Sequence, residues 1–192
     1  MRNLRLLSLT VVAAMAMMAF AASSASATAL YSGATKLGSG TSLDWSVKFV
    51  VKIIDTSHNE LDSCSTSTLA GKLTTATTVN IEALTWGSCT FTTNTVTLGK
   101  LEVVWTAATE GEVKSDAGIE VTINTGAFGS CIYGFASGTK LGTLKTFSSG
   151  AATFELHGVA TRSGSNFLCP ASTVLEGVLT TTSPTNLRVE KE

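Results

Sequence analysis

The chain has 192 residues, of which 44% are hydrophobic and only 14% charged, and its formal net charge at pH 7 is −1. A charge so small and so evenly spread argues against nucleic acid or an anionic membrane as partner, because both favour basic patches. The length suits one domain with a substantial core. The abundance of Thr, Val and Gly, with only two prolines, favours strands and turns over helices.

The first 27 residues have the three parts of a secretory signal peptide. Arg2 and Arg5 form a positive start, an apolar stretch covers 6–22, and Ala25-Ser26-Ala27 is a small-residue cleavage pattern. The apolar stretch lies near the lower end of the roughly 17–25 residues that span a bilayer, and a cleavage pattern follows at once. We therefore predict a signal peptide over 1–27 and a single secreted, extracellular domain over 28–192, with no stable membrane anchor.

The mature chain reads as short strands between turn signals. Residues 28–43 are rich in Gly and Ser and are expected to hold at most one edge strand. The strongest strand is predicted over 45–54, where Trp45, Phe49 and Ile53 share one face and lysines lie on the other. The charged stretch 110–116 is expected to be a solvated loop. Further strands are predicted at 61–69, 73–84, 95–98, 101–107, 118–124, 131–135, 151–160, 174–181 and 187–189, and 84–91 is predicted to be a bend that leads into a strand.

This pattern of roughly ten short strands without a convincing amphipathic helix is typical of a sandwich or a Greek-key barrel. We expect an all-β fold, an antiparallel β-sandwich of immunoglobulin-like or jelly-roll-like type. A helical bundle would need apolar residues at i, i+3, i+4 and i+7, and no mature segment sustains that spacing beyond about two turns.

All four cysteines fall in the mature part, and an even number in an exported protein indicates two disulfides. They are Cys64, Cys89, Cys131 and Cys169. Four cysteines allow three connectivities, and the sequence alone leaves them open. We expect the sequential pairs Cys64–Cys89 and Cys131–Cys169, because they close the shortest loops, each contributing on the order of 3–4 kcal/mol. A zinc site would need close pairs such as C-x-x-C, and the chain has none.

Few residues suit catalysis. The two histidines are His58, in a predicted turn, and His157, on a predicted sheet surface, and no G-x-S-x-G motif is present. Glu110, Glu112 and Asp116 match no known calcium loop, so solvation explains them better. We therefore expect no enzymatic activity, no cofactor and no metal site.

Three tryptophans are candidates for ligand stacking, namely Trp45, Trp86 and Trp105. If two of them lie exposed on one sheet face, they can stack on sugar rings, because an aromatic face offers apolar area with a polar rim. The alternative is that each belongs to the core, which is the common place for tryptophan in a domain of this size.

Several segments, most of them centred on cysteines, together resemble a family of uncharacterised secreted actinobacterial proteins with a four-cysteine all-β domain. The segments are LYSGATKLG (30–38), LTWGSCTF (84–91), GSCIYG (129–134), LGTL (141–144), SNFLCP (165–170) and TSPT (182–185). The resemblance implies export and carries over no active-site residue. Where that family commonly has an aromatic residue near its last strand, this chain has Leu187-Arg188-Val189.

These observations favour a non-enzymatic extracellular or cell-surface domain with a structural or adhesive role. The alternative is a carbohydrate- or cell-wall-binding module that uses exposed aromatic side chains. The expected partner is accordingly a cell-surface polysaccharide or protein. Edge strands low in charge also favour self-association.

Overall fold

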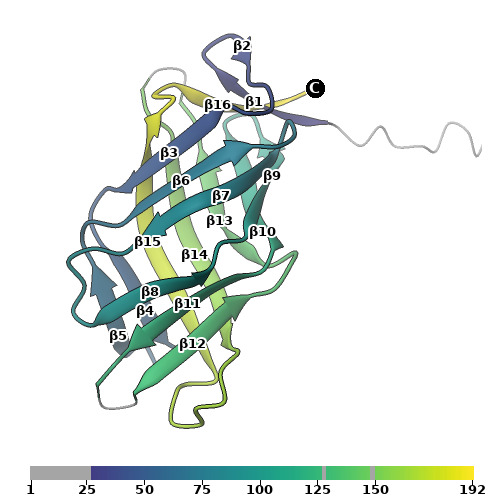
Figure 1. Cartoon of the computed structure of the whole chain (residues 1–192). Coiled ribbons are helices and arrows are strands. Elements are labelled where there is room, and N and C mark those ends of the chain that lie inside the picture. The colour runs from purple at the N-terminus through teal and green to yellow at the C-terminus, as the bar shows by residue number, and fades with distance from the viewer. Residues whose placement is uncertain (1–26, 127–128, 148–149) are drawn as a thin grey trace, which may run out of the picture.

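A computed structural model describes residues 27–126, 129–147 and 150–192 (Figure 1), so the predicted signal peptide lies outside the described residues except for Ala27. The described residues form sixteen β-strands and no helix. The strands are β1 (Thr28–Ser32), β2 (Thr35–Lys36), β3 (Ser42–Val47), β4 (Val51–Asp55), β5 (Glu60–Cys64), β6 (Thr68–Leu73), β7 (Thr78–Thr85), β8 (Thr92–Thr97), β9 (Lys100–Ala107), β10 (Glu110–Ala117), β11 (Ile119–Asn124), β12 (Ser130–Phe135), β13 (Lys140–Lys145), β14 (Thr153–Arg162), β15 (Ser172–Ser183) and β16 (Leu187–Lys191).

Alternating burial explains why these segments are strands. In β11 the apolar Ile119, Val121 and Ile123 are buried, and the polar residues between them face outward. The prediction of a solvated loop over 110–116 is wrong, because this stretch is β10 and buries Gly111, Val113 and Ser115 while its charges point outward. The inward-facing Gly and Ser residues are not hydrophobic, so a hydrophobicity pattern does not reveal the alternation of this strand.

Eight strands form a closed antiparallel ring, which we call the upper ring. Its order is β15-β3-β6-β7-β9-β10-β13-β14, and the pairing of β14 with β15 closes it. That pairing extends from Thr153 opposite Thr180 to Thr161 opposite Ser172, so β14 and β15 are the long strands behind the barrel in Figure 1.

The same two long strands continue into a second ring, the lower ring. Beyond the upper ring β14 changes its partner from β13 to β12, and β15 changes from β3 to β4. The lower ring therefore has the order β15-β14-β12-β11-β8-β5-β4. Between β5 and β8 this ring has no full ladder. Instead, the end of β5 contacts residues 87–93, and we call this contact the seam.

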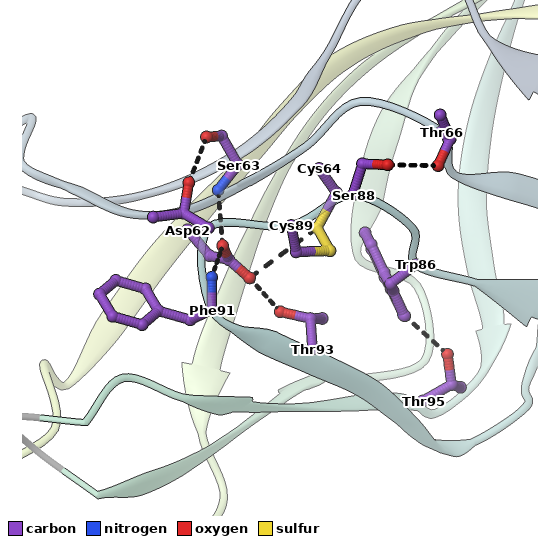
Figure 2. Close-up of a disulfide and its surroundings, with 11 residues drawn as sticks. Asp62, Ser63, Cys64, Thr66, Trp86, Ser88, Cys89, Phe91, Thr93 and Thr95 are labelled. Atoms are coloured by element: carbon purple, nitrogen blue, oxygen red, sulfur yellow. Dashed lines mark hydrogen bonds between the residues drawn. A yellow bond between two sulfur atoms is a disulfide. The ribbon is translucent and has the colours of Figure 1, made fainter.

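The seam is a short antiparallel contact centred on the Cys64–Cys89 disulfide (Figure 2). Beside it, the carboxylate of Asp62 is buried, with 1% of the residue exposed. This carboxylate accepts hydrogen bonds from the Ser63 and Phe91 backbone N–H groups, at 2.8 and 2.9 Å, and from the Thr93 hydroxyl. Asp62 thus ties β5 to the strand across the seam by charge-assisted hydrogen bonds.

The all-β fold and the two disulfides, Cys64–Cys89 and Cys131–Cys169, are confirmed. The β-sandwich expected from strand spacing is corrected to a barrel, because the β14–β15 ladder closes the sheet on itself and does not leave two separate layers. Strand spacing alone does not distinguish these architectures, since both consist of short antiparallel strands.

A separate three-stranded sheet, β16-β1-β2, covers the upper end of the barrel (Figure 1). Leu30 and Leu187 from this cap are fully buried, and Val189 lies against the position where Gly111 has no side chain. The segment 28–43 therefore contributes more than the single edge strand expected from it, because Leu30 supplies core contacts that its Gly-rich surroundings conceal.

The strand predicted over 45–54 is divided into β3 and β4, and Phe49 between them is 69% exposed instead of sharing the core face of Trp45. The division occurs where the chain passes from the upper to the lower ring. There it follows β15, with β3 pairing at Leu179 and β4 at Glu176.

We predict that Asp62→Ala lowers the free energy of unfolding by about 3 kcal/mol, because it leaves buried donors at the seam without their charged acceptor. Asp62→Asn, which keeps one acceptor oxygen, is expected to lose about 1 kcal/mol. Urea unfolding of the oxidised protein measures both. Asp116→Ala, at an exposed strand position, is the matched control and should stay within about 0.5 kcal/mol of the parent. Equal stability of Asp62→Ala and Asp116→Ala would contradict the role of the seam.

Candidate binding site

The loop 163–171, between β14 and β15, projects from the lower end of the barrel, where Figure 1 draws it in yellow-green. We call it the tip loop. It contains no charged residue, and it carries Phe167, which is 82% exposed, and Leu168, which is 55% exposed. Single exposed apolar side chains are common on protein surfaces, whereas two adjacent ones at a projecting tip make this loop a candidate binding site.

Covalent and polar contacts fix the base of the tip loop. The Cys131–Cys169 disulfide ties it to β12. The Arg162 guanidinium donates from Nη1 to the carbonyl oxygens of Asn166 and Cys169, at 3.0 and 2.7 Å. The Phe167–Leu168 pair is therefore held between two anchored residues and not on a free strand of chain.

The Asn166 side chain adds one further contact within the loop and one to β12. Its Oδ1 accepts from the Leu168 N–H at 3.1 Å, and its Nδ2 donates to the Ser130 carbonyl at 3.3 Å. The backbone around Leu168 is thereby ordered before any partner binds, which lowers the entropic cost of binding.

The three tryptophans lie in different parts of the barrel. Trp45, on β3, is 5% exposed, and its Nε1 has no hydrogen-bond partner in the part of the chain that the structure describes. Trp86 is half-buried after β7 and donates from Nε1 to the Thr95 hydroxyl at 2.9 Å (Figure 2). Trp105, on β9, is half-buried beneath the Lys191 ammonium, 5.4 Å from the ring centre. Trp45 thus belongs to the core and offers no face to a ligand outside the barrel.

Among the described residues, no hydrogen bond joins either histidine to a side chain that could act as a nucleophile. His58 is exposed in the turn after β4, and the carboxylate of Asp55 organises that turn by accepting from the backbone of Ser57 and Asn59. Hydrogen bonds from Asn59 hold the pKa of the Asp55 carboxyl below its usual value. His157 is exposed on β14 and lies 3.1 Å from the Glu176 carboxylate.

One group of ligand-type atoms is close enough to suggest a metal, that of Asp62, Cys64 and Cys89, which lie within 4.8 Å of one another among the described residues. Both sulfur atoms are in the disulfide, and the Asp62 carboxylate already accepts the seam hydrogen bonds. This group is structural. On β10, the Glu112 carboxylate pairs with Lys140 at 2.9 Å and Lys114 at 3.2 Å, and these lysines hold its pKa below the usual range.

An open groove of about 630 Å³ crosses the outer face of β13 and β14, and we call it the outer groove. At Gly142 the two strands approach so closely that a Cβ would lie 2.0 Å from the Glu155 carbonyl oxygen. Both polar and apolar atoms form its walls, and its lining consists of Thr139, Lys140, Gly142, Thr143, Glu155, His157 and Val159.

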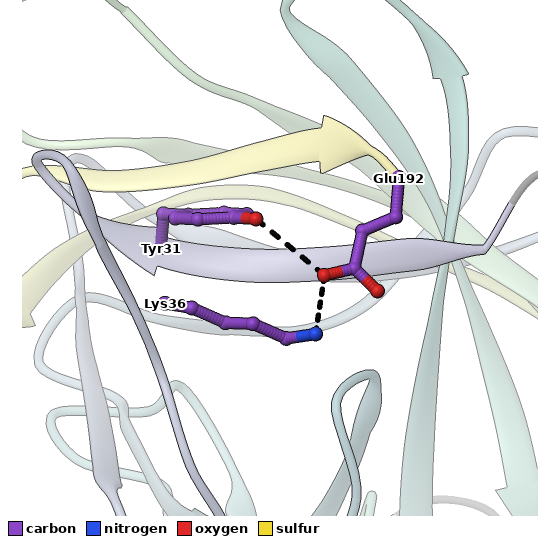
Figure 3. Close-up of polar contacts among 3 residues, drawn as sticks. All are labelled: Tyr31, Lys36 and Glu192. Carbon is purple, nitrogen blue, oxygen red and sulfur yellow. Dashed lines mark hydrogen bonds and ion pairs between the residues drawn. The ribbon is translucent and has the colours of Figure 1, made fainter.

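Polar contacts at the opposite end of the barrel serve the cap. Glu192, which follows β16, accepts a hydrogen bond from the Tyr31 hydroxyl at 3.5 Å and forms an ion pair with Lys36 (Figure 3). The Glu192 hydrogen bond raises the pKa of the Lys36 ammonium. These contacts join β1, β2 and the residue after β16 at an exposed surface, where such pairs add little stability.

Comparison with protein-family models, curated proteins and solved structures finds no match to this chain. The resemblance to secreted actinobacterial proteins thus stays a prediction. Within the described ranges, no helix is long and apolar enough to cross a membrane. The two disulfides are consistent with an extracellular location.

Sequence reasoning directed attention to the tryptophans and missed the tip loop. Its signal was present in SNFLCP, where an adjacent Phe and Leu stand between turn residues and a cysteine. Apolar residues in that position suggest core packing, and only the three-dimensional structure shows them outside.

Proposed function

We propose that this chain is a non-enzymatic extracellular domain with an adhesive role, and that Phe167 and Leu168 are its contact point. The observation that carries the proposal is the high exposure of two adjacent apolar side chains on a disulfide-anchored loop. The proposed partner is a protein with an apolar pocket, since full burial of a Phe or Leu side chain contributes about 1.5–3 kcal/mol.

The way the loop is anchored supports binding. A flexible loop loses conformational entropy when a partner orders it, and a loop already ordered by Arg162 and Asn166 loses less. Energetic hot spots in interfaces are also few, often aromatic, and surrounded by contacts that contribute little energy. The uncharged tip loop around Phe167 matches that arrangement.

We predict that the double variant Phe167→Ser, Leu168→Ser binds cell envelopes of the source organism at least tenfold more weakly than the parent domain. The loss is expected because the variant removes the apolar area that the partner would bury. Quantitative sedimentation of labelled, oxidised domain with isolated envelopes measures it. Protease treatment of the envelopes should abolish binding if the partner is a protein.

Phe49→Ser is the matched control. Phe49 is also exposed, at 69%, but it lies between β3 and β4 with the Lys48 ammonium 5.5 Å from its ring centre. This variant should bind envelopes like the parent. Unchanged binding by the double variant, or an equal loss with Phe49→Ser, would contradict the proposal.

A second candidate function is carbohydrate binding in the outer groove, favoured by its open shape and mixed polar lining. Lys140, Thr143 and His157 offer hydrogen-bonding groups there, and Val159, 50% exposed, offers apolar area for a sugar face. In this candidate function the sugar binds in the outer groove and not against the tryptophans that the sequence suggested for stacking.

For this candidate, sedimentation of the domain with insoluble polysaccharides should detect binding that soluble sugar competes away. His157→Ala combined with Thr143→Ala should reduce that binding about tenfold without affecting the binding that depends on Phe167. If the domain sediments with none of the polysaccharides and not with cell wall, this candidate function is excluded.

A further inference from the structure

A buried carboxylate lies against the disulfide of the seam. The Oδ2 atom of Asp62 is 3.8 Å from the Sγ atom of Cys64, and each of these two residues is 1% exposed. Cys89, the other half of the disulfide, is half-buried, so the bond is closed to solvent at Cys64 and partly open at Cys89 (Figure 2). Any reaction of this disulfide therefore takes place beside the Asp62 carboxylate.

The hydrogen bonds of Asp62 suit an ionised carboxyl group. Its oxygens accept from the backbone N–H groups of Ser63 and Phe91, which can only donate, and from the Thr93 hydroxyl. None of the ion pairs among the described residues includes Asp62. The negative charge at the seam is thus stabilised by hydrogen-bond donors and not by a cation.

The chain on both sides of the seam provides no positive charge to offset this carboxylate. The segments that meet there, 63–71 and 83–99, contain no charged residue. Lys52, on the neighbouring strand β4, is exposed and forms an ion pair with Glu60 at 2.8 Å. Reactive cysteines lie beside Lys, Arg or His, which stabilise the thiolate. The surroundings of Cys64 are the reverse of that arrangement.

Reduction of a disulfide by a thiol begins with attack by a thiolate and releases another thiolate. An external thiolate that attacks the Cys89 sulfur forms a mixed disulfide with it, breaks the Cys64–Cys89 bond and leaves the electron pair on the Cys64 sulfur. That thiolate would be buried beside the Asp62 carboxylate, where two negative charges repel each other more strongly than in bulk water. Attack on the Cys64 sulfur would instead bring the external thiolate itself to the same place.

We infer that Asp62 protects the seam disulfide from external thiols by raising the barrier of this first exchange step. Reduction is completed when a second external thiolate attacks the external sulfur of the mixed disulfide. This attack releases the Cys89 thiolate and a disulfide of the reductant, and both cysteine thiolates take up protons from water. The same first transition state is crossed when the seam closes again from the mixed disulfide, so Asp62 slows both directions.

The other disulfide has the opposite surroundings. Beside Cys131–Cys169, the Arg162 guanidinium donates to the Cys169 carbonyl oxygen at 2.7 Å. A cation near a disulfide stabilises both the approaching thiolate and the thiolate that leaves. The two disulfides of this domain therefore offer an internal comparison of the effect of charge on reduction.

The test is reduction of the folded, oxidised domain at fixed pH, stopped by alkylation and followed by mass spectrometry, which separates the two disulfides. With 2-mercaptoethanol, Asp62→Asn should open the seam disulfide about tenfold faster than the parent, each rate taken relative to Cys131–Cys169 in the same sample. Thr93→Val is the matched control, because it removes a hydrogen bond of the seam and keeps the carboxylate. Its relative rate should stay within about threefold of the parent.

Two outcomes with these variants would overturn the inference. One is a relative rate for Asp62→Asn equal to that of the parent. The other is an equal acceleration in Asp62→Asn and Thr93→Val, because the rate would then be set by loosening of the seam and not by charge.

A second measurement uses the parent domain alone and so does not depend on the folding of any variant. Cysteamine carries a positive charge beside its thiolate, whereas mercaptoacetate carries a second negative charge. The ratio of the cysteamine rate to the mercaptoacetate rate should be about fivefold higher at Cys64–Cys89 than at Cys131–Cys169. Equal ratios at the two disulfides would show that no negative charge acts on exchange at the seam, and would overturn the inference.

Discussion

The seam between β5 and residues 87–93 is the contact on which the lower half of the barrel depends. The upper ring is closed by ladder pairing on every side, but the lower ring lacks a ladder between β5 and β8. There the Cys64–Cys89 disulfide and the Asp62 carboxylate take the place of a ladder. Without them β5 and β8 would be open edges, which pair readily with other chains.

Closure of the seam completes the part of the barrel that carries the tip loop. It completes the ring that holds β12 and β14, and those strands carry the two anchors of the tip loop, Cys131 and Arg162. It also brings Ser67 and Trp86 to the same level of the barrel, because the chain between Cys64 and β6 and the chain between β7 and Cys89 both start from the disulfide. The anchored position of the tip loop is thus a consequence of this closure.

The sequence predicted those structural features that depend on neighbouring residues or on cysteine spacing. The alternation in 118–124 predicted β11, and cysteine spacing predicted both disulfides. The barrel was not predictable in this way, because its closure depends on β14 pairing with both β13 and β15, a choice among partners and not a property of any one strand. The buried carboxylate of Asp62 gave no signal either, since acidic residues on strands are normally solvated.

The site was less predictable than the fold. Trp45 and Phe49 were predicted to share one face of a single strand. Trp45 is buried and Phe49 is exposed, because the chain passes from one ring to the other between them. Ser67 is one of many serines, and its hydroxyl is buried only because of its position at the meeting of two rings. Both facts arise from long-range pairing, which no short segment encodes by itself.

Hydrogen exchange of a variant with Cys64 and Cys89 both replaced by Ala, compared with the parent, tests the role of the seam most directly. If the seam closes the lower ring, amides of β4, β5 and β8 in the variant exchange through local opening, while those of β9, β10 and β13 keep the protection set by global unfolding. Lower-ring protection that stays equal to that of the upper ring in the variant would contradict it, because the lower ring would then close without the seam.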